Sequence, residues 1–260
     1  MKSFSKDELK VDLIKIREKG FIPNHRTGNH GGIGNTLEDL LGIEENNLPI
    51  PNAAEWELKS QRLGTVSLTT LFHVEPSPTA MRLVPSQLLP LYGWKHGKAD
   101  TLYPETEMSF RQTIHSLARS DRGFQVIVDE KQQKIMVSFD ANSVGERHSK
   151  WLLSVEARVG LGELNPQPYW GFNDLFHKAG AKLLNCFYVQ AEVKKINGQD
   201  FYHYKEILIL KDFSLSKFLT GIKQGYILVD FDARTGHNHG TKFRLRQNYF
   251  PNLYDHVESI

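Results

Sequence analysis

The sequence contains little cysteine and no long apolar segment. Its single cysteine among 260 residues, Cys186, excludes a disulfide within the chain and a zinc site built from several cysteines. The apolar neighbours of Cys186 in residues 183–189 predict a buried thiol. The N-terminus lacks the apolar stretch of a signal peptide, and no run approaches the roughly 18 apolar residues of a membrane span. We therefore expect a cytoplasmic protein with no membrane contact.

The chain also lacks a strong net charge. Its 32 lysines and arginines nearly balance 30 aspartates and glutamates, which leaves a formal charge of +2. Bulk charge therefore does not indicate a nucleic-acid partner, and only local clusters of charge can do so. Acidic residues gather around residues 38–45 and basic residues around 242–246. A hydrophobic content of 40% and a charged content of 24% are ordinary for a packed globular protein, so a disordered binder is not expected.

A glycine-rich loop precedes a short predicted helix. Four of the seven residues 28–34 are glycines, which permits a close approach of the backbone to another group. Asn35 or Thr36 can cap a helix over residues 37–41, and Gly42 is placed to end it. Backbone N–H groups at a helix start suit a phosphate group. The loop is not a nucleotide-binding P-loop, because the Gly-Lys-Ser/Thr ending is missing.

A short strand is predicted over residues 54–60. Alternate residues of a strand share a face, so Glu55, Glu57 and Lys59 point one way and Trp56 and Leu58 point the other. Carboxylate oxygens bind hard cations such as Mg²⁺, and a nearby lysine can stabilise negative charge in a transition state. Glu-x-Lys is nevertheless common, and by itself it indicates no more than a solvated strand face.

The order of these features resembles a known family. The sequence is similar to the MvaI/BcnI restriction endonucleases, which are relatives of the mismatch-repair nicking enzyme MutH in the PD-(D/E)xK nuclease superfamily. The matching stretches are residues 31–41, 44–52, 57–60 and 237–244. They have the order and separation of the family, whereas residues 75–180 match poorly.

The resemblance implies an α/β fold with a mixed central β-sheet flanked by helices, in two lobes around a DNA-binding cleft. We place the catalytic lobe mainly in residues 1–150 and the DNA-recognition lobe mainly in residues 151–260. The implied activity is that of a type II-like restriction endonuclease, which hydrolyses phosphodiester bonds of double-stranded DNA at a short specific site. The implied cofactor is Mg²⁺, with Mn²⁺ as a substitute. We expect a monomer, with a cognate DNA methyltransferase encoded nearby.

One position departs from the family pattern. The family has an aspartate five residues before the glutamate of Glu-x-Lys, and this chain has Asn52 there. By resemblance, Glu57 binds the metal, Asn52 takes a second ligand position, Lys59 assists the water and Glu38 supports the metal shell. An amide oxygen lacks the charge of a carboxylate, so Mg²⁺ binding should weaken. The position could have been changed deliberately, Glu55 or Glu38 could supply the missing charge as a metal ligand, or the protein could bind DNA without cutting it.

The downstream block is a predicted donor-rich loop between two strands. Arginine can pair with guanine, histidine can read base edges, and lysine can contact phosphates. The candidate DNA contacts in this block are Arg234, His237, His239, Lys242 and Arg244. Because the glycine-rich loop at the helix start suits a phosphate, we also expect its Arg26 and His30 to contact the DNA backbone. Three alternatives remain: a zinc site on the two histidines, which lacks an evident third ligand, an HNH nuclease motif, whose residues should be spread out, and a plain surface loop.

The remaining segments predict a mixture of helices and strands. Ser5 and Glu8 have the spacing of a capping box, which predicts a helix that ends near Gly20. Asn197-Gly198 predicts a hairpin. Residues 75–90 are rich in proline and are expected to be irregular. Other expected elements are a strand or short helix over 67–72, a hairpin over 123–139, helices over 148–159 and 214–225, and strands over 226–231 and 241–246.

Three functions other than cleavage of unmodified DNA remain open. A DNA-binding protein that retains the nuclease fold but is catalytically silent would fit Asn52. A nuclease for modified DNA or for RNA would share the same active-site residues. An interaction protein that carries Glu-x-Lys by chance would show no DNA affinity at low salt, where phosphate contacts are strongest.

Overall fold

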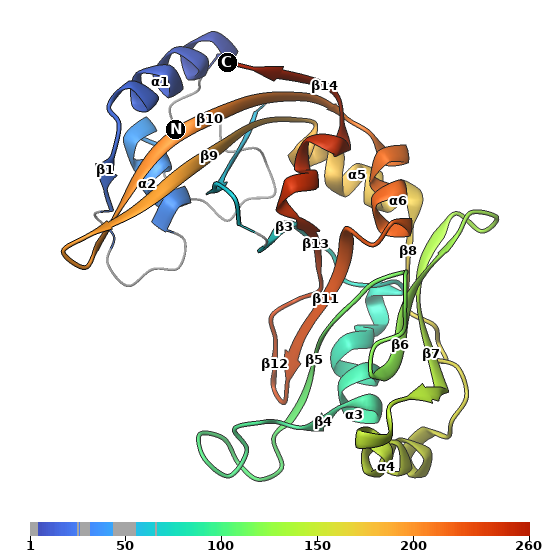
Figure 1. Ribbon diagram of the computed structural model, residues 1–260. Coiled ribbons are helices and arrows are strands. Elements are labelled where there is room, and N and C mark those ends of the chain that lie inside the picture. Colours follow the sequence, from blue (N-terminus) through green and yellow to red (C-terminus); the bar gives the residue numbers. More distant parts are fainter. Residues whose placement is uncertain (1–4, 25, 27–31, 44–55, 66) are drawn as a thin grey trace. The chain divides into compact units, whose positions relative to one another are not determined.

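The structure is a computed structural model that describes residues 5–24, 26, 32–43, 56–65 and 67–260 (Figure 1). Its contacts divide the chain into two compact units. Unit 1 takes residues 1–67, 179–214 and 247–260, and unit 2 takes residues 68–178 and 215–246. The predicted boundary between residues 150 and 151 lies inside helix α4 (Ser149–Val159) of unit 2. Because the chain passes between the units at four points, no single cut separates them.

Unit 1 is built on a five-stranded mixed sheet, which bears out the predicted mixed α/β class. The strand order is β1-β10-β9-β2, and β14 pairs with β10. Strand β2 runs parallel to β9, and the other pairs are antiparallel. The bounds are β1 Ile22–Pro23, β2 Glu57–Arg62, β9 Asn185–Ile196, β10 Gln199–Phe213 and β14 Tyr254–Ser259.

The β9–β10 hairpin turns at the predicted pair. Asn197 and Gly198 have φ angles of 51° and 83°. Positive φ at both central residues is the requirement of a type I′ turn, whose twist matches that of the flanking strands. The hairpin prediction is therefore confirmed.

Two helices cover one face of this sheet. Helix α1 (Lys6–Glu18) begins at the predicted capping box, with Ser5 and Glu8 bonded reciprocally. Helix α2 (Gly32–Leu41) begins earlier than the predicted cap at Asn35 or Thr36. Gly32 is the first residue of the helix, and a Cβ there would lie 2.5 Å from the Tyr202 hydroxyl oxygen, so only glycine fits. The glycine therefore serves the close approach that was predicted, but within a helix instead of a loop.

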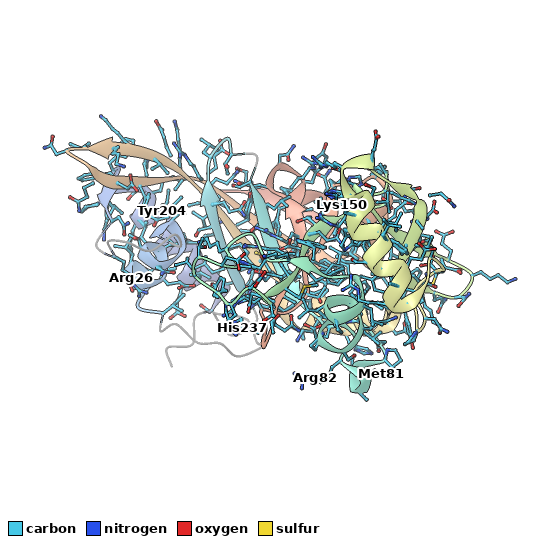
Figure 2. The ribbon with its side chains drawn as sticks, turned by 90° about the horizontal axis from the view of Figure 1, so that it is seen from below. Arg26, Met81, Arg82, Lys150, Tyr204 and His237 are labelled. Atoms are coloured by element: carbon cyan, nitrogen blue, oxygen red, sulfur yellow. The ribbon has the colours of Figure 1, made fainter. Side chains whose placement is uncertain are left out.

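The hydroxyl group of Tyr204 attaches α2 to the sheet (Figure 2). It donates a hydrogen bond of 2.8 Å to the carbonyl oxygen of Ile33, in the first turn of α2. Burial raises the pKa of Tyr204, so the hydroxyl keeps the proton that this bond needs.

Unit 2 contains two antiparallel sheets. The six-stranded sheet has the order β3-β13-β11-β5-β4, with β12 paired to β11, and the three-stranded sheet has the order β6-β7-β8. The larger sheet comprises β3 Leu68–His73, β4 Trp94–Lys95, β5 Met108–Ile114, β11 Ile227–Arg234, β12 His237–Asn238 and β13 Lys242–Arg246. The smaller sheet comprises β6 Arg122–Asp129, β7 Lys134–Val144 and β8 Tyr169–Gly171. The hairpin predicted over 123–139 is thus confirmed, and the segment 67–72 is a strand.

The proline-rich stretch 75–90 is more regular than predicted. It contains η1 (Thr79–Met81) and η2 (Val84–Leu88), and α3 (Leu89–Tyr92) follows directly. Prolines occupy the second positions of η2 and α3, in the first turn, where the N–H group has no partner within the helix to lose. Burial of Leu88 and Tyr92 stabilises the helical conformation of this stretch.

The helices of the remaining chain agree only in part with the predictions. Helices α4 (Ser149–Val159) and α6 (Leu215–Lys223) are present as expected, and η3 (Glu146–His148) precedes α4. Helix α5 (Phe172–Leu183) was not predicted, nor were η4 (Gln247–Leu253) and the final strand β14. Among the described residues, no helix has the combination of length and apolar character that a membrane crossing needs.

Candidate active site

Strand β2 carries the candidate catalytic pair at one end of the unit 1 sheet. Trp56 and Leu58 belong to the hydrophobic core that also contains residues of α1 and α2. The centre of the Trp56 ring lies 4.9 Å from the centre of the Phe187 ring. Glu57 and Lys59 share the opposite face and form an ion pair. The alternation predicted from the sequence is therefore confirmed for residues 56–59, and Glu55 lies outside the described residues.

The Glu57 carboxylate is buried between two lysines. Glu57 is only 1% exposed. Its Oε1 atom lies 2.8 Å from Lys59 Nζ and 3.8 Å from Lys182 Nζ. Its Oε2 atom is buried and has no hydrogen-bond partner among the described residues. A buried carboxylate is costly unless its charge and its acceptor positions are satisfied, so Oε2 stands out as an open acceptor.

This open oxygen fits a hard cation. Mg²⁺ keeps several waters and is usually held by one or two carboxylates together with substrate phosphates. Glu57 supplies one such carboxylate. No cluster of three or more His, Cys, Asp or Glu side chains able to hold a metal occurs in the part of the chain that the structure describes. Asn52 and Glu55, the other predicted ligands, lie outside the described residues.

Cys186 and Tyr254 lie close to the buried carboxylate. Cys186 is the β9 partner of Glu57 in the strand register. Burial, and then the Glu57 charge, raise the pKa of the Cys186 thiol. Burial also raises the pKa of Tyr254, with further contributions from Cys186 and Glu57. Both groups are therefore neutral near pH 7. Cys186 is buried, as the sequence predicted, and its raised pKa makes the thiol unreactive.

Glu38 is on α2, which packs against the other face of the strand. The neighbouring Leu37 and Leu41 belong to the core cluster that contains Trp56 and Leu58. The helix of Glu38 thus covers the face opposite to the one on which Glu57 points. The role of Glu38 in a metal shell stays a prediction.

Arg26 is held by α2. Its Nε donates to Asp39 Oδ2 at 2.9 Å, and its Nη2 pairs with Oδ1 of the same carboxylate. This bidentate ion pair fixes the Arg26 guanidinium beside the helix. A DNA phosphate that binds Arg26 would therefore have to share the guanidinium with Asp39. His30, the other predicted contact of the loop, lies outside the described residues.

A polar pocket lies between α2 and the end of β2. Its volume is about 550 Å³. Among its lining residues are Gly34 and Asn35 of α2, Ser60 and Arg62 of β2, and Thr65. The first turn of α2 carries no acidic residue, so hydroxyls, amides and one arginine set the chemistry of the pocket. This setting suits an anionic group such as a phosphate.

The residues predicted to recognise DNA, 234–244, begin at the turn between β11 and β12 in unit 2. Arg234 of β11 pairs with His237 of β12, and Gly236 between them has a φ of 70°. His237 and His239 are exposed, and His237 Nε2 lies 3.3 Å from His239 Nδ1. Both imidazoles are therefore accessible to a ligand (His237 is labelled in Figure 2), and their role in DNA contact stays a prediction. The described residues provide no third metal ligand beside them.

The three cations of the block are each paired with a carboxylate. Arg234 lies 3.0 Å from Glu107, Lys242 lies 3.5 Å from Asp232, and Arg244 lies 3.4 Å from Asp230. The pairs hold the long side chains in defined positions and reduce their net charge. This arrangement suits directed hydrogen bonds better than bulk attraction to phosphates.

Two residues of these sites were missed by sequence reasoning. Glu75 holds the loop after β12, because its Oε1 accepts from the Thr241 backbone N–H at 3.0 Å and from Asn238 Nδ2 at 3.3 Å. Lys182 reaches Glu57 from α5. No local motif marks Glu75. The apolar spacing of Leu175, Ala179 and Leu183, all buried, could have revealed α5.

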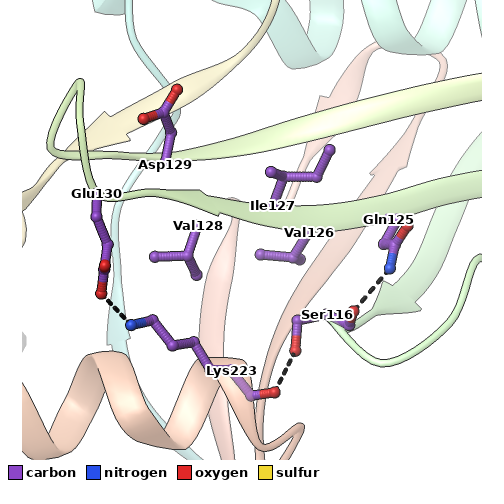
Figure 3. A pocket seen from close by; sticks show the side chains of 8 residues that line it. All are labelled: Ser116, Gln125, Val126, Ile127, Val128, Asp129, Glu130 and Lys223. Atoms are coloured by element: carbon purple, nitrogen blue, oxygen red, sulfur yellow. Dashed lines mark hydrogen bonds and ion pairs between the residues drawn. The ribbon is translucent and has the colours of Figure 1, made fainter.

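A second pocket, in unit 2, shows no comparable chemistry (Figure 3). Its volume is about 660 Å³, and β6 and Lys223 line much of it. Lys223 pairs with Glu130, and Gln125 Nε2 donates to the carbonyl oxygen of Ser116 at 2.7 Å. Three interactions in Figure 3 thus join polar groups of the lining to one another, and we assign no site there.

Comparisons with known proteins agree with the resemblance seen in the sequence. The solved structure of a restriction endonuclease MvaI–cognate DNA substrate complex is 23% identical, with 99% of each chain covered and a TM-score of 0.74. That of restriction endonuclease MvaI in the absence of DNA is 24% identical, with 100% of each chain covered and a TM-score of 0.57. At these identities the two structures show a shared fold. No curated protein matches the chain. A model of the MvaI/BcnI restriction endonuclease family matches residues 11–254, and the chain therefore belongs to this family.

Proposed function

We propose that the chain is a type II-like restriction endonuclease, which hydrolyses phosphodiester bonds of double-stranded DNA at a short specific site with the help of Mg²⁺. The observation that carries the proposal is the buried Glu57 carboxylate, with Lys59 on one oxygen and no described partner on the other. A Glu-x-Lys strand with this geometry, in a chain of this family, supports cleavage. The family relative solved with cognate DNA supports duplex DNA as the substrate.

The residues divide the chemistry between them. Glu57 would hold the cation through Oε2, and Asn52 would offer an amide oxygen. When bound, Mg²⁺ or Mn²⁺ polarises the phosphate and lowers the pKa of a bound water. Lys59, which Glu57 holds at 2.8 Å, presents its ammonium group where negative charge develops on the phosphate and orients the attacking water. Glu38 and Glu55 would support the metal shell.

The oligomeric state, the location and a protecting partner enzyme belong to the same proposal. Each chain has one candidate active centre, at Glu57 and Lys59, so a monomer can act on one strand at a time. A restriction endonuclease works where DNA is present, which places the protein in the cytoplasm. The DNA of its own cell would need protection from cleavage, and a cognate DNA methyltransferase encoded nearby would provide it by methylating the site.

A catalytically silent DNA-binding protein is the second candidate, and Asn52 favours it. The test is a cleavage assay on unmethylated plasmid and phage DNA, for the chain as it stands and for Asn52→Asp, in Mg²⁺, Mn²⁺ and EDTA. We expect discrete metal-dependent fragments. We also expect Asn52→Asp to raise the rate at low Mg²⁺ by on the order of tenfold, because a carboxylate attracts the cation more strongly than an amide.

The outcomes separate the candidates. Fragments from the unmodified chain establish a working endonuclease. Cleavage by Asn52→Asp alone identifies a silent form. Cleavage of methylated DNA or RNA duplexes in parallel, with none of unmethylated DNA, identifies a nuclease for those substrates. If neither protein cuts, and neither binds duplex DNA at low salt, the nuclease proposal is wrong.

The exposed histidines provide a test of recognition. His237→Ala should cost about 1–3 kcal/mol at a base pair that this side chain reads, because a base-edge hydrogen bond is lost. Sequencing the fragment ends from a random-sequence DNA library would show reduced cleavage and a relaxed preference at that position. His256→Ala is a matched control, because the His256 side chain is 73% exposed and lies in unit 1. An unchanged site preference in His237→Ala would remove this residue from the recognition surface.

A further inference from the structure

Among the described residues, the Glu57 carboxylate has more positive charge beside it than it needs. Lys59 alone neutralises Glu57 at 2.8 Å, yet Lys182 also lies 3.8 Å from the same Oε1 atom. Together these three side chains carry a net charge of about +1 when all are ionised. Two ammonium groups at one oxygen repel each other, so the second one is not required to stabilise the buried carboxylate.

The position of Lys182 is set by the packing of α5. Lys182 is in the last turn of the helix, and the adjacent Leu183 is fully buried, as is Ala179 one turn earlier. The Lys182 side chain is 30% exposed, so it is partly shielded from solvent and only partly screened. The helix therefore holds a cation beside the oxygen pair of Glu57, where a divalent cation would also have to bind.

The positive charges of Lys59 and Lys182 should weaken the binding of a cation at Glu57. A divalent cation at Oε2 would share the Glu57 carboxylate with two ammonium groups and be repelled by both. A DNA phosphate near Lys182 attracts the partly exposed ammonium group, which lies 3.8 Å from Oε1, and thereby weakens its repulsion of the cation. Binding of the cation and binding of the phosphate would then favour each other, which is a positive coupling between two ligands.

We propose that Lys182 makes cation binding at Glu57 depend on the DNA phosphate, so that the site takes up its metal together with its substrate. The inference rests on the proposed function, because it assumes that Glu57 binds a divalent cation and that DNA reaches it. Lys182 acts through Glu57 and is a positioning residue. Nothing in the Glu-x-Lys motif indicates this role, since Lys182 comes from a different element.

The experiment measures the coupling directly. Mn²⁺ affinity of the DNA-free protein is measured by electron paramagnetic resonance of free Mn²⁺. Affinity for a labelled duplex is measured by fluorescence anisotropy in Ca²⁺ and in EDTA, and the ratio of the two gives the coupling. The variants are Lys182→Met, Lys182→Arg, and Lys178→Met as a control one turn earlier on α5. Thermal unfolding in EDTA checks each variant, and Lys182→Gln replaces Lys182→Met if the latter fails to fold.

We expect Lys182→Met to bind Mn²⁺ about tenfold more tightly without DNA, because one repelling charge is removed. Its Ca²⁺-to-EDTA affinity ratio should fall by a similar factor. Lys182→Arg keeps the charge and should behave as the unmodified chain does, as should Lys178→Met. An unchanged or weaker Mn²⁺ affinity in Lys182→Met would overturn the inference while leaving the proposed function intact. Absence of both Mn²⁺ and DNA binding in the unmodified chain would overturn both.

Discussion

Glu57→Gln is expected to lower the single-turnover rate of DNA cleavage by about a thousandfold or more. Glutamine keeps the shape of the side chain but removes its charge. The cation then loses its carboxylate, and Lys59 and Lys182 lose the group that holds them. Affinity for duplex DNA in EDTA should not fall, because removing a buried negative charge leaves the phosphate-facing cations in place. The measurements are plasmid cleavage in Mg²⁺ and anisotropy in EDTA.

Glu192→Gln is a matched control for this variant. Glu192 is on β9 of the same sheet and pairs with Lys205 at 3.5 Å, but its side chain is 50% exposed. An exposed ion pair contributes little to stability, so the control should cleave and unfold as the unmodified chain does. Cleavage by Glu57→Gln at the rate of this control would place the active centre elsewhere.

Phe187→Ala is expected to destabilise unit 1 by about 3–5 kcal/mol. Phe187 is fully buried, pairs with Leu58 in the β2–β9 register and contacts the Trp56 ring. Truncation leaves a cavity directly beneath the strand that carries Glu57 and Lys59. Urea denaturation followed by tryptophan fluorescence should show a lower midpoint, and cleavage should fall because β2 is less firmly held.

Phe176→Ala provides the comparison for the loss of a phenyl ring. Phe176 is on α5 and is 41% exposed, so its removal creates no closed cavity. We expect a change within about 1 kcal/mol. Equal destabilisation by the two variants would mean that the packing under β2 does not hold the site.

Short-range features of the fold could be predicted because their causes are local. The alternation of Trp56 through Lys59 follows from strand geometry in any fold. The Asn197-Gly198 turn follows from the conformations that these two residues tolerate. The cap at Ser5 follows from a side chain that reaches three residues along. In each case the interacting atoms are close neighbours in the chain.

Predictions were wrong or missing where packing decides the local structure. Helix α2 begins at Gly32, before the predicted cap, and the close approach of Tyr202 requires a glycine at this position. The proline-rich stretch before α3 is helical because burial of Leu88 and Tyr92 outweighs the weak local signal. Strand β14 has only Tyr254 buried, so no alternation of apolar residues marks it.

By itself, the sequence determined the family, the Glu-x-Lys pair and the departure at Asn52, because these are patterns of residue identity along the chain. Only the tertiary structure decided which charges meet. Lys182 reaches Glu57 because α5 leads into β9, which pairs with β2, and the partners of Arg234, Lys242 and Arg244 are likewise set by the folding of the sheet. Ion pairs between distant segments depend on the path of the whole chain, and no local spacing encodes that path.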